Sequence, residues 1–366
     1  MTIALEQPTL AANVCALPAR YQASYTTRLV AEVVDKRPAD FWLETTGTPQ
    51  AGDVVLARVT AINNHKRVET PESRKAILFE GALVMLAYGH RYAADQFLAH
   101  VPEDLGPCHL VAAGGIAGTV TEMHEDVDEP TEIEPLGLLA TDTGVVNIRD
   151  FASHDNPLTV QVAPNRPQVI AVLGTSMNSG KSTTLACLVN GLDAAGRTVA
   201  AGKITGTGAG NDRMIYHDAG ASSVIDFTDF GYGSTFKLNF AEIRALSINM
   251  INALAATGAD TVIVEIADGI YQAETARLLR DQIFQDSVDH VVFSAVDALG
   301  ARAGVQELRV TGLNVAAASG VMTSSPLATA EAGAVLDVPV IATFDLTNPH
   351  IAAHTVGAVK STRDNA

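Results

Sequence analysis

One segment restricts the possible folds of this chain more than any other, and it runs from Val169 to Thr184. It reads VIAVLGTSMNSGKSTT, an apolar run, then a loop bounded by glycines, then residues that favour a helix. A strand that enters a helix through such a loop is typical of a parallel α/β sheet. Glycines accept positive φ angles, so the loop backbone can wrap closely around an anion. The segment therefore predicts a phosphate-binding loop of the Walker A type.

Each residue type in this loop has a chemical role. The first amides of the following helix, together with its dipole, favour negative charge. Lys181 can reach the β- and γ-phosphates of a nucleotide, and the Ser182 hydroxyl can ligate Mg²⁺. Five residues lie between the two glycines of this loop, whereas the common form of the loop has four. The predicted nucleotide-binding residues are Gly174, Thr175, Ser176, Met177, Asn178, Ser179, Gly180, Lys181, Ser182 and Thr183.

The net charge of the chain argues against two classes of binding partner. The chain has 366 residues and a formal net charge of −17, with 41 acidic against 24 basic side chains. Such a charge repels nucleic acid and anionic lipid, so we expect neither as a partner. There are three widely spaced cysteines, no leader-like amino terminus and no apolar run long enough to span a membrane, which together predict a cytoplasmic protein.

The apolar rhythm changes along the chain and predicts two domains. Up to residue 150 the apolar runs are short and strand-like, which predicts a β-rich domain of unknown role, in the form of a small barrel, with one helix over Ser73 to Ala87. The acidic stretch Glu122 to Glu132 reads as hydrated surface rather than as a metal site. Residues 151–167 hold three prolines and predict a linker, residues 168–348 an α/β domain, and residues 349–366 a frayed tail.

In the second domain, continuously apolar strands alternate with helices, which predicts a doubly wound, mostly parallel sheet with helices on both faces. The strands are expected at residues 169–173, 198–204, 223–227, 261–266, 290–295, 315–322 and 338–344. The longer helices are expected at residues 181–194, 241–256, 273–284 and 328–335.

Lys203 and Glu265 are candidates for the site because open α/β sheets bind ligands at the carboxyl ends of their strands, and Asp212 is a third candidate, which a family resemblance given below implies. Lys203 and Glu265 each end a predicted strand, and Asp212 lies in a glycine-rich loop. The predicted catalytic residues are Lys181, Lys203 and Glu265. The predicted Mg²⁺ ligands are Ser182 and Glu265, with Asp212 as the third ligand that the resemblance given below implies. Lys203 as a solvated strand-end charge, Asp212 as a plain turn residue, and Asp268 in place of Glu265 remain open alternatives.

The loop GTSMNSGKSTT resembles the phosphate loop of dethiobiotin synthetase and of the cobyric and cobyrinic acid synthases. It is also similar to that of the D-glutamate N-acetyltransferase-like bacterial P-loop proteins. The likeness covers roughly Gln168 to Leu346, in the stretches AAGKITGTG, AGNDRM, VIVEIADG and GLNVAAASGVMTSSP. It departs from the synthetases at Ile266 to Gly269, where they have a small-residue turn, and at Met322-Thr323, where no base-reading Asn follows.

This resemblance implies an enzyme of the ligase or synthetase type, with ATP and Mg²⁺ as cofactors. It would phosphorylate and so activate a carboxylate or similar group of a small-molecule substrate. A homodimer is expected, because related synthetases often place their sites between subunits. Two alternatives stay open: a coenzyme A-dependent N-acyltransferase acting on an amino acid, and a nucleotide-sensing protein without catalysis.

Overall fold

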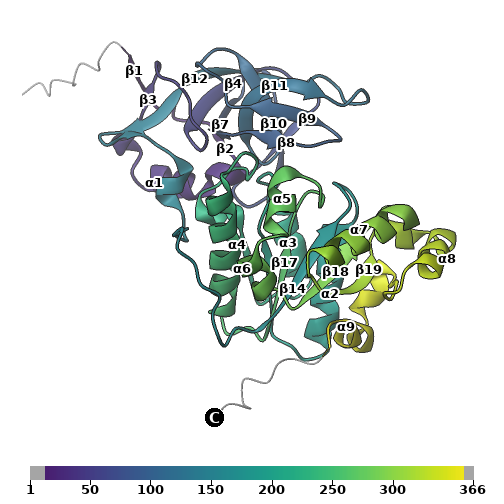
Figure 1. The fold of residues 1–366 in the computed structure, drawn as a ribbon. Helices are drawn as coiled ribbons and strands as arrows, with labels where there is room; N and C mark the ends of the chain where they lie inside the picture. Colours follow the sequence, from purple (N-terminus) through teal and green to yellow (C-terminus); the bar gives the residue numbers. More distant parts are fainter. Residues whose placement is uncertain (1–12, 358–366) are drawn as a thin grey trace, which may run out of the picture. The chain divides into compact units, whose positions relative to one another are not determined.

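A computed structural model describes residues 13–357, and these residues form two compact units (Figure 1). The chain passes from the first unit to the second after Ala152, and the short segment Ala93–Asp95 groups with the second unit. Between residues 13 and 357, no helix has both the length and the apolar character needed to cross a membrane.

The first unit is β-rich, as the sequence predicts, and its described residues include the α-helix α1 (Arg28–Lys36). Five of its strands pair in a closed ring in the order β4, β7, β11, β10, β12 and back to β4, with only the β7–β11 pair parallel. The prediction of a small barrel is thereby confirmed. The strands are β1 (Val14–Ala16), β2 (Gln22–Ala23), β3 (Trp42–Glu44), β4 (Val54–Ala61), β5 (Arg67–Glu69), β6 (Lys75–Ile77), β7 (Leu83–Tyr88), β8 (Arg91–Tyr92), β9 (Phe97–His100), β10 (Cys108–Ala112), β11 (Ile116–Met123), β12 (Thr131–Thr141) and β13 (Gly144–Val145).

The ring follows from the two-residue period of its strands. On β4, Val55 and Val59 join a buried cluster to which all five ring strands contribute, so they face the interior of the ring. Val54 and Leu56 point to the opposite side, where they join a cluster with Val30 of α1. Successive side chains of β4 therefore pack into two different hydrophobic cores.

The helix predicted over Ser73 to Ala87 is wrong. The segment forms β6 and β7, and a turn at Gly81, with a φ of 83°, separates them. A residue with a left-handed backbone conformation interrupts an α-helix, so no helix can run through Gly81. Pairing of β7 with β4 and β11, both distant in sequence, then decides the conformation of the apolar run.

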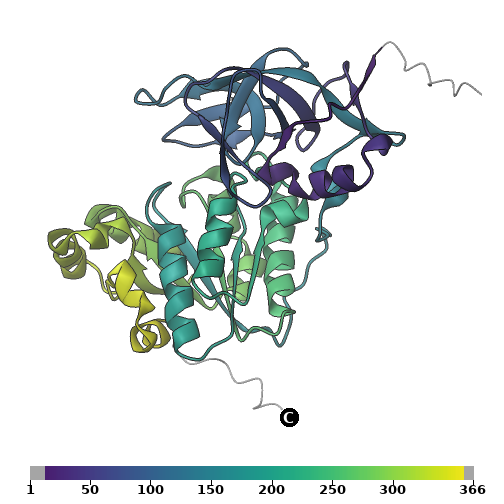
Figure 2. The same cartoon turned by 180° about the vertical axis from the view of Figure 1, so that it is seen from behind.

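The second unit is a six-stranded sheet in the order β16-β15-β17-β14-β18-β19, and every pair is parallel. Helices cover both faces (Figure 1), and the view from behind shows α2 and its neighbours (Figure 2). This confirms the predicted doubly wound α/β class. The elements are β14 (Gln168–Gly174), α2 (Lys181–Ala194), β15 (Val199–Lys203), α3 (Gly210–Asp218), β16 (Ser223–Asp226), α4 (Phe240–Ala255), β17 (Thr261–Glu265), α5 (Ala273–Leu278), α6 (Gln282–Ser287), β18 (His290–Ser294), α7 (Ala298–Val310), β19 (Val315–Ser319), α8 (Pro326–Val335) and α9 (Pro349–Val356).

The carboxyl-terminal region departs from expectation in two places. The strand predicted at 338–344 reduces to a single bridge between Val340 and Ala318, followed by a 3₁₀ helix at Thr343–Thr347. The tail predicted from residue 349 is wrong for Pro349–Val356, which is helix α9, capped by the Asn348 side chain. Residues 358–366 of that predicted tail lie outside the described part of the chain.

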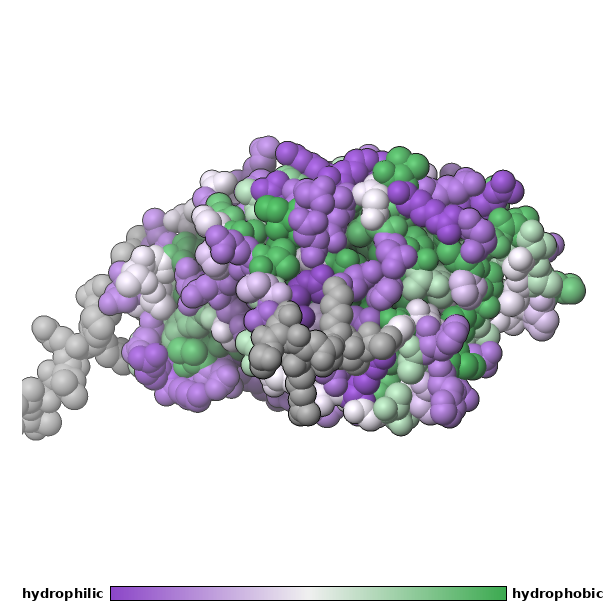
Figure 3. Space-filling view, turned by 60° about the horizontal axis from the view of Figure 1, so that its bottom comes forward, coloured by the Kyte–Doolittle hydropathy of each residue, from purple (hydrophilic) through white to green (hydrophobic). Residues whose placement is uncertain are grey.

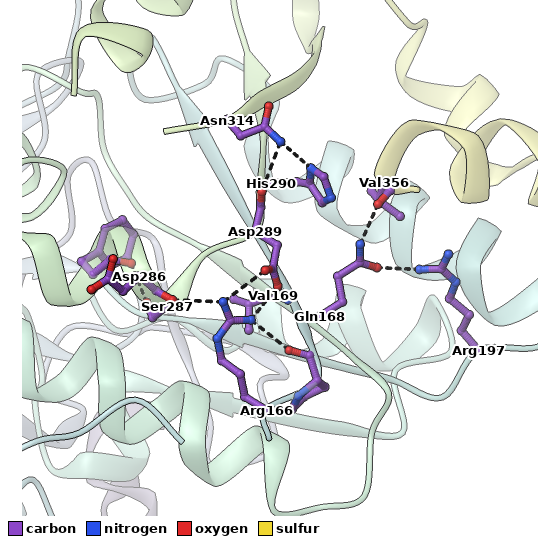
Figure 4. A network of polar contacts seen from close by, with 12 residues as sticks. Arg166, Gln168, Val169, Arg197, Asp286, Ser287, Asp289, His290, Asn314 and Val356 are labelled. Atoms are coloured by element: carbon purple, nitrogen blue, oxygen red, sulfur yellow. Dashed lines mark hydrogen bonds and ion pairs between the residues drawn. The ribbon is translucent and has the colours of Figure 1, made fainter. Parts of the chain in front are cut away.

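A polar network secures α9 at the amino-terminal ends of β14 and β18 (Figure 4). Gln168 Nε2 donates to the carbonyl oxygen of Val356 at 2.6 Å, and Arg197 Nη1 donates to Gln168 Oε1 at 2.8 Å. Arg166 and Asp289 form a mostly buried ion pair at 2.5 Å. Residues 153–167, most of the predicted linker, group with this second unit, and Arg166 is one of their attachments to it.

Apolar side chains remain at the surface around α8. Leu327 on α8 is 80% exposed and Val310 at the end of α7 is 84% exposed. Figure 3 shows hydrophobic residues at the surface toward the right, on the side where Figure 1 places α8.

Candidate functional site

The loop between β14 and α2 depends on its two glycines. A Cβ on Gly174 would lie 2.3 Å from Ser179 Oγ and 3.0 Å from the Ser294 carbonyl oxygen, so no larger residue fits there without a shift. Gly180, the N-cap of α2, has a φ of 94°, and Asn178 also takes a left-handed conformation with a φ of 60°. The predicted strand, loop and helix at Val169 to Thr184 are confirmed.

Polar groups of this loop remain without protein partners. The start of α2 has no side-chain cap and no acidic residue in its first turn. The hydroxyl oxygens of Thr175 and Ser179 are buried and have no hydrogen-bond partner among the described residues. Lys181, which is 5% exposed, folds back so that its Nζ donates to the Ser176 carbonyl oxygen at 2.8 Å. Burial lowers the pKa of Lys181, and nearby carboxylates, Glu265 first among them, oppose that shift.

Lys203 and Glu265 end neighbouring parallel strands in direct register, as the last residues of β15 and β17. The same register places Glu265 opposite Val172 of β14, just before the phosphate loop. The structure therefore brings these two residues together with the loop at the carboxyl edge of the sheet.

Four polar side chains form one buried network at this edge. Lys203 Nζ makes an ion pair and a hydrogen bond with Asp212 Oδ2, and it lies 3.5 Å from Glu265 Oε1. Tyr216 donates its phenolic hydrogen to Glu265 Oε2. Burial disfavours the charge on Lys203, but Glu265 and Asp212 outweigh it and raise the pKa of Lys203 above its ordinary value. Burial likewise opposes the charge on Asp212, yet Lys203 holds the pKa of Asp212 below its usual range.

A cavity of about 440 Å³ lies between the phosphate loop and this network. Two ammonium groups and three carboxylates border it, those of Lys181, Lys203, Asp212, Glu265 and Asp268. Its other lining residues are Met177, Asn178, Gly180, Ser182, Thr183, Asn211, Ile215, Ala267 and Val321. The loop residues that do not line the cavity are Gly174, Thr175, Ser176 and Ser179.

Sequence reasoning missed Tyr216, whose phenol contacts Glu265. The helix that carries it, α3, is absent from the expected elements, although Asp212 and Tyr216 stand four residues apart, which on a helix is one turn. His217, on the same helix, is exposed and does not line the cavity.

Among the described residues, no group of three or more His, Cys, Asp or Glu side chains is placed to hold a metal ion by itself. Mg²⁺ in nucleotide sites usually takes one or two protein oxygens and completes its coordination with phosphate and water. The hydroxyl of Ser182 and the carboxylates of Asp212 and Glu265 are oxygen donors of that kind, and all three residues line the cavity.

Comparison with known proteins gives only distant likenesses. No protein-family model matches the chain, and no curated protein matches it either. Among solved structures, it is similar to the signal recognition particle receptor FtsY from Elizabethkingia anophelis in complex with GDP, with 15% identity, a TM-score of 0.35 and coverage of 56% of this chain and 68% of that chain. It is also similar to the 54 kDa signal recognition particle protein from Aeropyrum pernix in complex with GDP, with 18% identity, a TM-score of 0.35 and coverage of 57% and 50%.

A third similar structure is the cell division protein FtsY from Thermotoga maritima, with 15% identity, a TM-score of 0.35 and coverage of 58% of this chain and 75% of that chain. Sequence identities and TM-scores this low indicate neither a ligand nor a reaction for this chain. In this chain the loop between β14 and α2 lies with Lys203 and Glu265 at the carboxyl edge of the parallel sheet.

Proposed function

We propose that the second unit binds the magnesium complex of a nucleoside triphosphate, with ATP as the expected nucleotide, and transfers its terminal phosphoryl group to a small molecule. One observation carries the proposal: Lys181 and Ser182 of the phosphate loop border the same cavity as Lys203, Asp212 and Glu265. Phosphoryl transfer needs little from a protein beyond positioning and neutralisation of charge, and this cavity offers groups for both.

The residues present fit a polyphosphate. The start of α2 has no side-chain cap and borders the cavity through Gly180, Lys181, Ser182 and Thr183, so its first backbone amides can bind an anion. Among residues 13–357, the Lys181 ammonium has the Ser176 carbonyl oxygen as its hydrogen-bond partner, which an anion can replace. Ser182, Asp212 and Glu265 would hold Mg²⁺, which supplies further charge neutralisation at the phosphates.

A carboxylate is the acceptor that we propose. Lys203 is held between Asp212 and Glu265, so its ammonium is positioned at the cavity wall by two acids. With Mg²⁺ bound to the remaining lone pairs of those acids, the ammonium can also face an anionic acceptor. A carboxylate oxygen of the acceptor then forms a bond to the terminal phosphorus as the bond to the β-phosphate oxygen breaks, which gives an acyl phosphate and a nucleoside diphosphate.

The test uses the purified full chain with ATP and Mg²⁺, GTP and Mg²⁺, coenzyme A and acetyl-coenzyme A, each as a ligand in thermal-shift titrations. We expect ATP with Mg²⁺ to bind, and Lys181→Ala to weaken that binding about 10–100-fold through loss of a charge-assisted hydrogen bond. Lys75→Ala, at an exposed lysine of the first unit, is the matched control and should leave binding unchanged.

Turnover is then measured as ADP release in the presence of pooled small carboxylic acids. Binding of coenzyme A without binding of ATP would overturn phosphoryl transfer and favour the acyltransferase. Tight nucleotide binding without ADP release for any acceptor would favour a sensor. The predicted homodimer is a separate question, which sedimentation of the same sample answers.

A further inference from the structure

Tyr216 is a buried tyrosine whose hydroxyl group reaches the candidate site. It is 1% exposed, and its ring lies in the apolar cluster under α2 and α3. Burying a phenolic hydroxyl is costly unless it is hydrogen-bonded, so a purely apolar role would be served as well by phenylalanine. The hydroxyl of Tyr216 instead donates to Glu265 Oε2, at the carboxyl edge of the sheet.

The Glu265 carboxylate is held from two sides. Tyr216 engages Oε2, while the Lys203 ammonium lies 3.5 Å from Oε1. Each carboxylate oxygen has two lone pairs, so both oxygens keep one pair directed elsewhere. A carboxyl group anchored in this way cannot rotate freely, and its remaining lone pairs keep a fixed direction.

Helix α3 explains how both contacts arise. Asp212 and Tyr216 stand one turn apart, so their side chains lie on the same face of the helix. Asp212 meets Lys203, and Tyr216 meets Glu265, so one helical face reaches both carboxyl-terminal strand ends. The Ser182 hydroxyl interacts with both Asp212 and Tyr216, which links the phosphate loop to the same face.

We propose that Tyr216 is a positioning residue, which fixes the Glu265 carboxylate for the divalent cation of the nucleotide complex. This inference rests on the proposed function. Hydrogen bonds to a metal-binding carboxylate orient it, and removing such a partner typically weakens metal binding about 10–100-fold. Tyr216 would act through Glu265 and would not touch the acceptor.

The experiment removes only the hydroxyl, with Tyr216→Phe in the full chain. Mn²⁺ is the probe, and its binding is measured directly by electron spin resonance, with and without ADP. We expect the Kd for Mn²⁺ in the presence of ADP to rise about 10–100-fold, and the Kd for ADP without metal to stay unchanged. Tyr232→Phe is the matched control, since it also removes a buried phenol hydroxyl, one that accepts from Asn156 Nδ2 at 2.9 Å.

A double-mutant cycle separates positioning from a structural role. If Tyr216 acts through Glu265, then Tyr216→Phe added to Glu265→Gln should bring no further loss of Mn²⁺ affinity. Additive losses, or an unchanged Kd for Mn²⁺ in Tyr216→Phe, would overturn the positioning role and leave the proposed function standing. A parent protein that binds neither ADP nor Mn²⁺ would overturn both.

A measurement on the parent protein covers the case in which Tyr216→Phe does not fold. Binding of Mn²⁺ withdraws charge from the Glu265 carboxylate, so it should change the ultraviolet difference spectrum of the tyrosine that donates to it. The Tyr232→Phe control should keep that signal. Metal binding without any tyrosine signal would contradict the proposal.

Discussion

Removal of the Lys203 ammonium tests the electrostatics of the site most directly. The change is Lys203→Met, which keeps much of the side-chain length and deletes the charge. In the parent protein the side chains of Lys203, Asp212 and Glu265 are 14%, 17% and 2% exposed, so all three are screened poorly by water. Without the ammonium, the carboxylates of Asp212 and Glu265 lose the cation that pairs with both of them.

Removing one partner of a buried ion pair costs about 3–5 kcal/mol. For a unit of this size that corresponds to a fall in melting temperature of roughly 6–20 °C in metal-free buffer at neutral pH. Added Mg²⁺ should restore part of this loss, and should stabilise the variant more than the parent, because a divalent cation can take the place of the ammonium between the two acids.

The sign of the pH dependence follows from Asp212. Its pKa is lowered in the folded state by Lys203, so the pair stabilises the fold above the ordinary carboxyl pKa, and this contribution is lost as the pH falls. In the variant, the Asp212 carboxylate can be neutralised by a proton instead. The difference in stability between parent and variant should therefore be largest near neutral pH and shrink on acidification.

The assay is thermal unfolding followed by circular dichroism, with and without Mg²⁺. Arg309→Met is the control, because it breaks an ion pair with Asp337 in the same unit whose two side chains are 44% and 69% exposed. Water screens such a pair, so little change is expected from the control. A variant at Lys203 that melts together with the control would refute the claim that its charge holds the network together.

Two further predictions concern other parts of the molecule. Burial lowers the pKa of His65 to about 4, so between pH 6.5 and 4 the folded first unit binds fewer protons than the unfolded chain. The stability of the first unit should therefore fall by up to ~3 kcal/mol as the pH is lowered through that window. Denaturant titrations of His65→Gln should lack this pH-dependent loss. In Gly191→Ala, the new Cβ would lie 2.0 Å from the Leu346 carbonyl oxygen and 2.7 Å from Ala352 Cβ. We therefore expect the free energy of unfolding to fall by about 1–3 kcal/mol and amide hydrogen exchange in α9 to become faster. Unchanged exchange in α9 would contradict this packing.

The parallel sheet could be predicted from the sequence because its strands are continuously apolar and separated by helices, so local pattern and tertiary structure agree. Residues 73–87 could not be assigned in this way. Their apolar residues suit either a helix or a pair of strands, and pairing of β7 with strands distant in the sequence decides between the two. Helix α9 was missed although Asn348 and Pro349 are a common capping pair at the start of a helix.

The sequence predicts the position of those site residues that end a strand. Lys203 and Glu265 lie in register because parallel strands place their carboxyl ends at one edge of the sheet. The contact of Lys203 with Asp212 could not be derived, since it requires α3, which the glycine-rich sequence before it conceals. Tyr216 was hidden for the same reason, because its relation to Asp212 exists only once that stretch is helical.

The strand ring of the first unit also constrains when that unit can fold. β12 closes the ring by pairing with β4, and between 71 and 83 residues separate the paired positions along the chain. Strands β4 and β7 can pair early, but their inward-facing apolar side chains stay exposed until β12 arrives. During synthesis, the first unit can therefore complete its core only after β12, which ends at Thr141, has left the ribosome.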